Sequence, residues 1–315
     1  MSSPATTSVP EATDPSPDEV PAILVDGASY VYPTGDVVAL REVTLRIGHG
    51  EIVGLVGQNG SGKTTLTKLF NGLLKPTGGR VVVNGIETRN ESVQELARHV
   101  GYVFQNPNHQ LFARTVQEEL EFGPRNLGLT DDEIAERVAD AVEFFDLSGE
   151  LGTHPYRLSF PLRKLVGIAS IYAMRPPVLV LDEPSTGQDH RTTGVINTLL
   201  RRLAELGTTV VCVSHDMPLL ADVVERVVVM RDAQVIADAS PRAVFADEDL
   251  MKRTNLHAPQ ATQIGLRTVA RDGGVVPLTP DEVASAVAER RGGGGPGRAT
   301  PDRGRNPTAT PSTSG

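Results

Sequence analysis

One octapeptide fixes the expected architecture of this chain: Gly57-Gln58-Asn59-Gly60-Ser61-Gly62-Lys63-Thr64. It fits G-x-x-x-x-G-K-[ST], the pattern of a phosphate-binding P-loop. A continuous apolar run at 52–56 precedes it, and a segment with helical character at 64–74 follows it. Since a P-loop lies between a strand and the N-terminus of a helix, these flanks predict nucleotide binding by this stretch.

Each part of the loop has a chemical reason. Glycines let the backbone turn sharply, so that successive N–H groups converge on one point, and the following helix adds its partial positive charge there. Lys63 supplies a full charge for the β- and γ-phosphates, and the hydroxyl of Thr64 can ligate Mg²⁺. The expected nucleotide-binding residues of this region are Gly57, Asn59, Gly60, Ser61, Gly62, Lys63, Thr64 and Thr65. The loop does not identify the reaction, because kinases, GTPases, helicases and transporters share it.

The overall composition narrows the class of protein. The chain has 315 residues with 39% hydrophobic content, enough for a globular core, and its net charge of −9 argues against nucleic acid as a partner. Its one cysteine, Cys212, lies in an apolar run and is expected to be buried. No apolar run approaches the roughly 18 residues of a membrane span, and residues 1–17 do not resemble a signal peptide. We therefore expect a cytoplasmic protein that would need another polypeptide to act across a membrane.

Apolar strands alternate with helices along the chain, which predicts an α/β fold with a mostly parallel sheet. Three early strands have no helix between them and predict an antiparallel β subdomain beside the nucleotide site: 22–25, 28–32 and 43–47. No strand is indicated in 105–173, so this region is interpreted as a helical insertion. Within it, Gly123-Pro124 is expected to end a helix that begins near Thr115.

The chain is divided by composition and pattern into four parts. They are a disordered N-terminal segment at 1–20, a nucleotide-binding domain at 21–240 with its helical insertion at about 106–173, a C-terminal extension at 241–290 and a disordered tail at 291–315. The extension is expected to hold a helix at 241–250 and another from Thr279 to Arg290.

Two strand ends carry groups suited to phosphate chemistry. Asp182 and Glu183 follow the buried run 178–181, where Asp182 would hold Mg²⁺ and Glu183 would act as general base on the attacking water. The alternative is an acidic strand end that only faces solvent. His215 follows the apolar run 209–213, where a γ-phosphate contact competes with an ordinary hydrogen-bonded loop histidine.

Two further candidates rest on weaker local signals. Gln105 ends the strand at 100–104 and could reach Mg²⁺ or the attacking water, although a lone glutamine more often has no such role. Tyr32 could stack on an adenine ring, with a core or turn tyrosine equally consistent with the local sequence.

The order of these motifs resembles the ATPase subunit of ABC transporters over about residues 22–239. The resemblance implies ATP hydrolysis, with catalytic roles for Glu183, His215 and Gln105 and with Mg²⁺ held by Thr64, Gln105 and Asp182. It also implies that Tyr32 stacks on the base, that Leu158-Ser159 begins the signature motif with Ser159 near the nucleotide, and that 185–189 forms the D-loop.

Two stretches are similar to the energy-coupling-factor branch of this family, GYVFQNPNHQLF at 101–112 and EFGPRNLGL at 121–129. That branch takes up vitamins and transition-metal ions such as cobalt or nickel. The resemblance implies two ATPase subunits docked on a transmembrane coupling protein at the cytoplasmic face of the membrane, with a separate substrate-binding membrane protein.

The signature departs from the family pattern LSGGQ and reads Leu158-Ser159-Phe160-Pro161-Leu162. In the family, the signature of one subunit closes over the nucleotide in the P-loop of the other. Phe160 and Pro161 replace two glycines, which obstructs close backbone approach and removes one N–H donor. We therefore predict a heterodimer, in which a regular signature from a different subunit completes the site of this chain.

Two other functions stay open. An ABC ATPase core could equally drive export, and only the family similarity favours import. A soluble ABC protein acting on ribosomes or DNA is disfavoured by the single P-loop, the lack of a heptad run and the negative charge.

Overall fold

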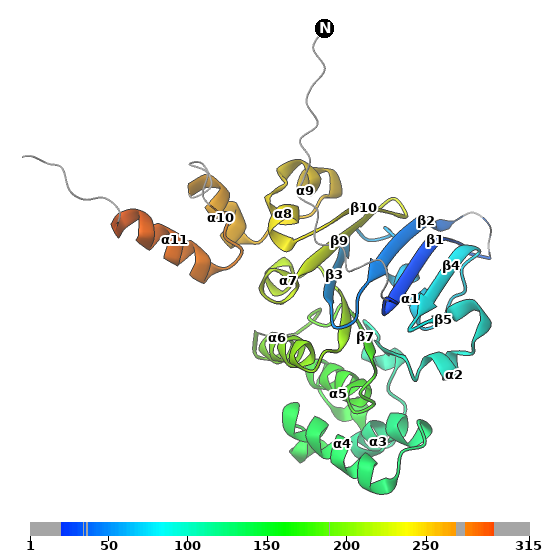
Figure 1. Ribbon diagram of the computed structural model, residues 1–315. Coiled ribbons are helices and arrows are strands. Elements are labelled where there is room, and N and C mark those ends of the chain that lie inside the picture. The colour runs from blue at the N-terminus through cyan, green and yellow to red at the C-terminus, as the bar shows by residue number, and fades with distance from the viewer. Residues whose placement is uncertain (1–19, 34, 36, 189, 269–274, 293–315) are drawn as a thin grey trace, which may run out of the picture.

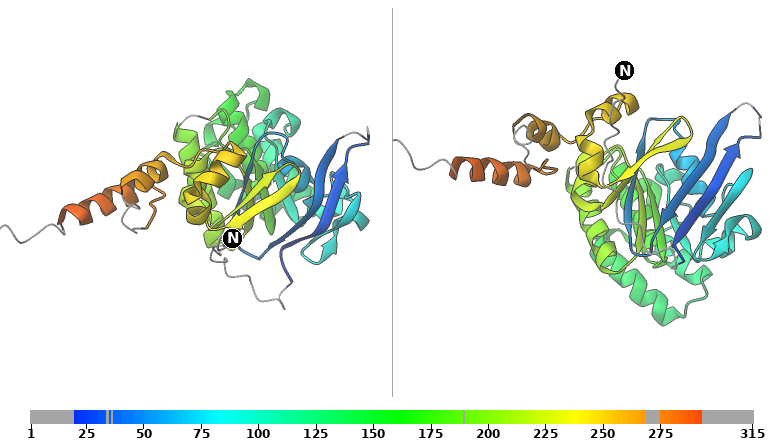
Figure 2. Two further views of the ribbon diagram at one scale, coloured as in Figure 1. Left: turned by 90° about the horizontal axis from the view of Figure 1, so that it is seen from above. Right: turned by 45° about the horizontal axis from the view of Figure 1, so that its top comes forward.

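The computed structural model describes residues 20–33, 35, 37–188, 190–268 and 275–292 (Figure 1). The two segments predicted to be disordered lie outside this range, apart from Val20 and the last two residues of the helix that ends at Gly292. Two β-sheets pack on either side of a helix, with a group of helices below them and a C-terminal helical extension at one side (Figures 1 and 2).

The larger sheet has six strands in the order β10-β9-β3-β8-β7-β6. Pairing is parallel from β9 to β6, and β10 pairs antiparallel with β9, so the predicted mostly parallel core is confirmed. The strands are β3 (Ile52–Gly57), β6 (Val100–Val103), β7 (Val178–Asp182), β8 (Thr209–Val213), β9 (Arg226–Arg231) and β10 (Gln234–Ala239). Every residue of β3, β6, β7 and β8 is buried, because helices or the second sheet cover both faces.

The smaller sheet is antiparallel, in the order β2-β1-β4-β5, as predicted. Its strands are β1 (Ile23–Val31), β2 (Val38–Ile47), β4 (Gly78–Val83) and β5 (Ile86–Glu87). The two strands expected at 22–25 and 28–32 are one strand, β1. A shift in register between Val25 and Ala28 absorbs Gly27, which has a φ of +57°, so the glycine marks a bulge rather than a break.

Helix α1 (Lys63–Phe70) lies between the two sheets. Leu66, Leu69 and Phe70 are fully buried in one hydrophobic cluster with residues of both sheets. The opposite face of the large sheet is covered by α5 (Phe160–Tyr172), α6 (His190–Glu205) and α7 (Met217–Val223), which form a second cluster. Helix α1 therefore covers one face of the large sheet, and these three helices cover the other.

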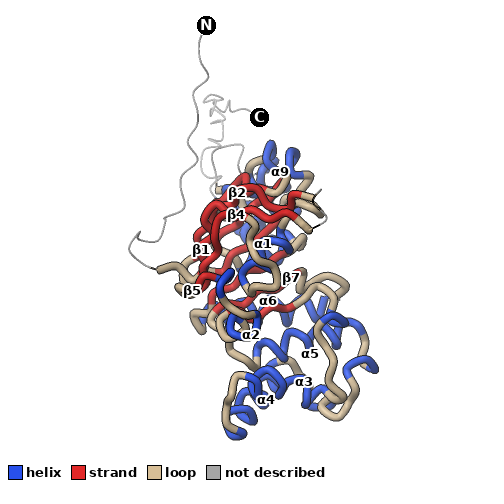
Figure 3. The backbone as a smooth tube through the Cα atoms, turned by 90° about the vertical axis from the view of Figure 1, so that its right-hand side faces the viewer, coloured by secondary structure: helices blue, strands red, loops and turns tan. Residues whose placement is uncertain are grey.

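The region 105–173, all of which the structure describes, contains no strand, as predicted. Its long helices are α3 (Val116–Asn126), α4 (Asp131–Phe144) and α5, and they gather below the sheets (Figure 3). Short 3₁₀ turns lie at η2 (Pro107–His109), η3 (Ser148–Glu150) and η4 (Pro155–Arg157), while η1 (Thr88–Asn90) and α2 (Val93–Leu96) precede the insertion.

The prediction that Gly123-Pro124 ends a helix is wrong, because α3 continues to Asn126. Pro124 is the ninth of eleven residues, so its missing N–H removes one late hydrogen bond of a short helix. Its ring is buried, and a side chain on Gly123 would collide with Met174 in the turn after α5. Tertiary packing of this dipeptide outweighs its local tendency to break the helix.

The C-terminal extension contains α8 (Pro241–Ala246), α9 (Glu248–Thr254), α10 (Gln260–Thr268) and α11 (Pro280–Gly292). The single helix expected at 241–250 is divided at Asp247, whose carboxylate accepts the Leu250 N–H at 2.8 Å and caps α9. Helix α10 was not predicted. Since Val244, Phe245, Leu250 and Met251 join the main core, α8 and α9 pack on the nucleotide-binding domain, while α10 and α11 project outward (Figure 2).

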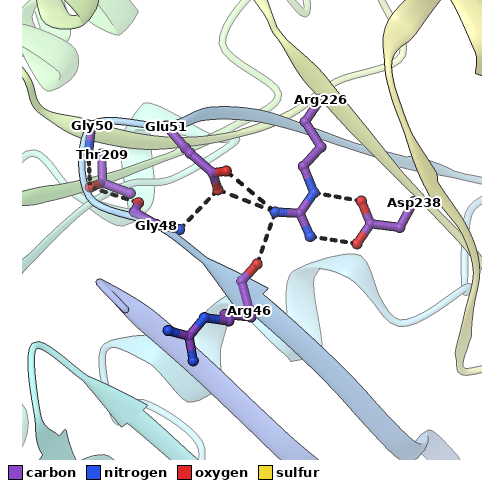
Figure 4. Close-up of polar contacts among 7 residues, drawn as sticks. All are labelled: Arg46, Gly48, Gly50, Glu51, Thr209, Arg226 and Asp238. Atoms are coloured by element: carbon purple, nitrogen blue, oxygen red, sulfur yellow. Dashed lines mark hydrogen bonds and ion pairs between the residues drawn. The ribbon is translucent and has the colours of Figure 1, made fainter. Parts of the chain in front are cut away.

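A network around Arg226 joins the two sheets at the edge opposite the P-loop (Figure 4). Its side chain is 15% exposed, and its guanidinium donates to both carboxylate oxygens of Asp238 at 2.6 Å and to Glu51 at 3.2 Å. It also donates to the Arg46 carbonyl of β2 at 3.0 Å. One side chain thus links β9 and β10 to the turn between β2 and β3.

Candidate active site

The carboxyl ends of β3, β6, β7 and β8 meet at one edge of the parallel sheet, where ligands of such folds bind. A cavity of about 450 Å³ opens there. Most of the predicted site residues line it, namely Tyr32, Asn59, Gly60, Gly62, Lys63, Thr64, Thr65, Gln105, Asp182, Glu183 and His215. Gly57, Ser61 and Ser159 do not.

Two P-loop glycines are required by their surroundings. A Cβ on Gly57, at φ +151°, would come within 2.2 Å of the Met230 carbonyl oxygen. A Cβ on Gly62, at φ +105°, would come within 2.5 Å of the Ala39 carbonyl oxygen. Both glycines let the loop lie directly against neighbouring backbone, and Gly62 leads into α1, so the loop N–H groups and the helix N-terminus face the same cavity.

Lys63 is 7% exposed, and its ammonium donates to the carbonyls of Gly57 at 2.7 Å and Gln58 at 2.9 Å. Burial lowers the pKa of Lys63, and the carboxylates of Glu183 and Asp182 oppose that shift. The ammonium is thus held at the mouth of the loop, close to two buried carboxylates that it partly neutralises.

The end of β7 and the start of α1 together form an oxygen donor set. The Thr64 hydroxyl lies 3.3 Å from Asp182 Oδ2, and the buried Tyr102 hydroxyl donates to the same oxygen at 3.0 Å. A carboxylate and a hydroxyl at the phosphate-binding loop fit Mg²⁺, which prefers oxygen ligands and commonly bridges phosphates. Gln105, exposed at the end of β6, lines the same cavity and could add an amide oxygen.

Glu183 is 6% exposed and is held by hydrogen bonds on both carboxylate oxygens. Nε2 of His215 lies 3.2 Å from Oε1 of Glu183. Oε2 accepts from the hydroxyl of Thr186 at 3.1 Å and from the backbone N–H of His215 at 3.4 Å. The structure therefore brings the predicted general base and the predicted histidine into direct contact. The His215 side chain remains 42% exposed toward the cavity.

Tyr32 lies at the entrance of the cavity. Its hydroxyl is 3.2 Å from the Thr65 hydroxyl, and its ring meets the Tyr30 ring edge-on at 5.0 Å between centroids. The ring is half-buried and lines the cavity, so it is placed where a base could stack, and that role stays a prediction.

The signature segment lies apart from this cavity. Ser159 is the N-cap residue of α5, but its exposed side chain makes no capping hydrogen bond. Phe160 is 39% exposed, and its ring packs near Gly187, where an added Cβ would lie 3.0 Å from it. Pro161 stands in the first turn of α5, so the N–H groups that begin this helix are one fewer than usual.

Three residues at the site were missed by sequence reasoning. Tyr102 is buried, and its pKa is raised by burial and by the Asp182 carboxylate. The hydroxyl of Thr186 donates a hydrogen bond to the Glu183 carboxylate. Lys164 of α5 is 1% exposed and donates to the carbonyls of Gln105, at 3.1 Å, and Glu183. Burial lowers the pKa of Lys164 to about 8, against the effect of Glu183 and Asp182. The one local signal for a role of Lys164 is its position directly before the apolar run 165–169.

The fold and this site define a P-loop ATPase. Residues 40–186 match the family described as ABC transporter. The chain is 41% identical over 238 residues to the energy-coupling factor transporter ATP-binding protein EcfA of Methanothermobacter thermautotrophicus, covering 75% of this chain and 76% of that protein. The chain therefore belongs to the family of ABC transporter ATP-binding proteins and is an ATPase.

Other relatives agree with this assignment. EcfA2 of Caldanaerobacter subterraneus is 36% identical over 82% of this chain and 92% of that protein. The putative ABC transporter ATP-binding protein TTE1589 of the same organism is 43% identical, but the match spans only 42% of its length. Similarity to energy-coupling-factor ATP-binding proteins is thus confirmed.

Solved structures show the same fold. CbiO1 from Clostridium perfringens, described as part of the ABC transporter complex cbiONQ, has a TM-score of 0.65 and 34% identity, covering 75% of this chain and 95% of that one. The cassette MJ0796, solved as a dimer in a post-hydrolysis state with ADP and Pi, has a TM-score of 0.63 and 29% identity, covering 70% of this chain and 99% of that one.

None of the helices among the described residues is both long and apolar enough to span a bilayer.

Proposed function

We propose that this chain is the ATP-hydrolysing subunit of an energy-coupling-factor importer for a vitamin or a transition-metal ion, working at the cytoplasmic face of the membrane. The similarity to EcfA proteins and to CbiO1 supports that branch. The observation that carries the hydrolytic role is the contact between Glu183 and His215 at 3.2 Å, beside the P-loop and inside one cavity.

In the proposed reaction the phosphates of ATP bind the N–H groups of the P-loop and the Lys63 ammonium, and the base stacks on Tyr32. A water oxygen forms a bond to the γ-phosphorus while the bond from that phosphorus to the bridging oxygen breaks, giving ADP and phosphate. Glu183 accepts the proton of that water, and His215 and Thr186 orient its carboxylate.

Thr64, Asp182 and Gln105 would hold Mg²⁺, which supplies positive charge beside the β- and γ-phosphates when bound. Tyr102 fixes the orientation of Asp182 through the hydrogen bond at 3.0 Å. The Asp182 carboxylate and the Thr64 hydroxyl are therefore arranged before the nucleotide arrives, which reduces the reorganisation needed at the reacting phosphate.

The second ATPase subunit is proposed to be a different chain. Ser159 is exposed and lies outside the cavity of its own chain, where it could reach a nucleotide held by a partner. Phe160 and Pro161 obstruct that approach. A heterodimer supplies a regular signature to the P-loop, Asp182 and Glu183 of this chain, while a homodimer would place the altered segment over both nucleotides.

A transmembrane coupling protein is the proposed partner of the helical insertion. A cavity of about 500 Å³ opens between α2, α3 and α5. Phe112, 60% exposed, and Phe122, 47% exposed, lie edge-on at its rim with centroids 4.6 Å apart. Exposed aromatic side chains around a concave surface suit the apolar side chains of a docking helix. The substrate would bind a further membrane protein.

The test compares tagged parent and Glu183→Gln chains expressed with their neighbouring genes. Glu183→Gln keeps the shape of the side chain and removes the base, so turnover should fall at least about 100-fold while ATP affinity stays within about threefold. Glu225→Gln, outside the cavity, is the matched control and should keep full turnover. Both chains should co-purify with a multi-span membrane protein.

Each part of the proposal has its own contrary result. Retained turnover in Glu183→Gln would remove Glu183 from the mechanism. Co-purification with ribosomes would favour a soluble ABC protein, and ATP-driven export by the reconstituted complex would replace the importer.

A further inference from the structure

A buried cation joins the signature helix to the active site. Lys164 is the fifth residue of α5, one helical turn after Phe160, and is 1% exposed. Its ammonium donates to the carbonyl of Gln105, after β6, and to the carbonyl of Glu183, after β7. One side chain thus connects three segments that are far apart in sequence, and none of the proposed catalytic steps uses it.

The backbone that Lys164 holds is strained. Glu183 has a φ of +51°, in the left-handed region that is unfavourable for a residue other than glycine. Its N–H donates to the Val213 carbonyl at 2.8 Å, and its carbonyl accepts from Lys164 and from the Thr186 N–H at 3.3 Å. This conformation turns the carboxylate toward His215 and the cavity, so the bonds that maintain it also aim the proposed base.

The charge of Lys164 suits this place. Asp182 and Glu183 are buried, with 4% and 6% exposure, and two unpaired carboxylates there would be costly. Lys63 at the start of α1 and Lys164 in α5 both interact electrostatically with these two carboxylates. An ammonium also donates more strongly to a carbonyl than a neutral group does.

We propose that Lys164 is a positioning residue for ATP hydrolysis, which fixes the backbone of Glu183 and Gln105 to the signature helix. The inference rests on the proposed role of Glu183. It predicts a defect in the chemical step and in the order of the 183–188 loop, with nucleotide binding retained.

The test uses the full chain in whichever assembly the parent hydrolyses ATP, alone or with its co-purified subunits. Lys164→Met keeps the apolar stem and removes the donor and the charge. Tyr172→Phe is the matched control, because it removes the hydrogen bond from Tyr172 to Asp140, 3.0 Å long, at the far end of α5. Turnover, ATP affinity, thermal midpoint and deuterium exchange of the 183–188 peptide are measured for both variants.

Lys164→Met should lower kcat about 10- to 100-fold, as expected for a misplaced reacting group, with ATP affinity within about threefold. Exchange of the 183–188 peptide should rise about tenfold, and Tyr172→Phe should change neither kcat nor this peptide. If Lys164→Met does not fold, Lys164→Gln, which keeps an N–H donor without the charge, takes its place with the same readouts.

A kcat within about twofold of the parent, or unchanged exchange of the 183–188 peptide, overturns the proposal. So does an equal loss in both α5 variants, since that would reflect helix stability alone. Glu183→Gln is measured in parallel. If it retains turnover, the proposed role of Glu183 fails; if only Lys164→Met retains turnover, Glu183 keeps its role and the positioning inference fails.

Discussion

The loops at the carboxyl edge of the parallel sheet and the turn that begins α5 use their polar groups in opposite ways. At the sheet edge, Lys63, Asp182 and Glu183 are buried and hydrogen-bonded. At the start of α5, Ser159 is exposed with no capping bond, and Phe160 is 39% exposed. The first region is organised by hydrogen bonds within the chain, whereas the second leaves the side chains of Ser159 and Phe160 exposed. Under the proposed function, the first region is a preformed half-site and the second is a poorly formed complement to the half-site of another subunit.

The largest effect is expected when a charge is removed from the loops at the carboxyl edge of the parallel sheet. Lys63→Met should weaken ATP binding about 100-fold, because a charged hydrogen bond to phosphate contributes about 1.5–3 kcal/mol. The measurement is titration with a fluorescent ATP analogue. Lys68→Met, on the same helix but outside the cavity, is the control and should bind normally. Affinity within threefold of the parent in Lys63→Met would mean that the edge is not a preformed phosphate site.

The next test asks whether the loops at the carboxyl edge of the sheet depend on the Arg226 network at the opposite edge. Arg226→Met should lower the free energy of unfolding by about 2 kcal/mol, because Asp238, Glu51 and the Arg46 carbonyl lose their shared donor. Urea denaturation measures this change, and ATP affinity should stay the same.

Arg80→Met is the comparison for that variant, since its pair with Asp26 is more than half exposed and should contribute less than about 0.5 kcal/mol. Equal losses in the two variants would show that burial of the Arg226 network has no special weight. A large loss of ATP affinity in Arg226→Met would show that the nucleotide edge is organised from a distance.

The smallest expected effect comes from restoring glycines in the turn that begins α5. The double variant Phe160→Gly, Pro161→Gly restores close approach and one N–H donor, and should raise turnover of the chain without its partner about tenfold. Steady-state ATP hydrolysis well below the melting temperature measures it. Phe160→Ala removes bulk but restores no donor, so it should give little gain. No gain in the double variant would remove the basis for expecting a different partner chain.

Local sequence was sufficient where a function needs a fixed spacing or a strand end. The P-loop needs glycines at Gly57 and Gly62 because neighbouring carbonyls leave no room for a Cβ. Asp182 and His215 could be placed together because parallel strands end at one edge. The helical insertion followed from the lack of strand patterns over 105–173, and its docking role stays a prediction.

Local sequence failed where packing decides. Pro124 indicates a break, yet α3 continues through it because Gly123 fits against Met174. Helix α10 was not predicted because its nine residues give few repeats of the helical spacing. Tyr102 lies in a strand buried on both faces, so no alternation shows which side its hydroxyl occupies, and only the pairing of β6 with β7 brings it to Asp182.

The sequence by itself determined the chemistry of this protein: a P-loop, an acidic strand end and a histidine, at spacings that an ABC ATPase requires. Those signals are local, since glycine conformations and strand ends are properties of short segments. Tertiary structure alone decided how the proposed base is held, because the Glu183 turn is supported by Val213, Thr186 and Lys164 from different parts of the chain. Hydrogen bonds between distant segments leave no pattern in sequence, since any polar residue can make them once the fold brings the segments together.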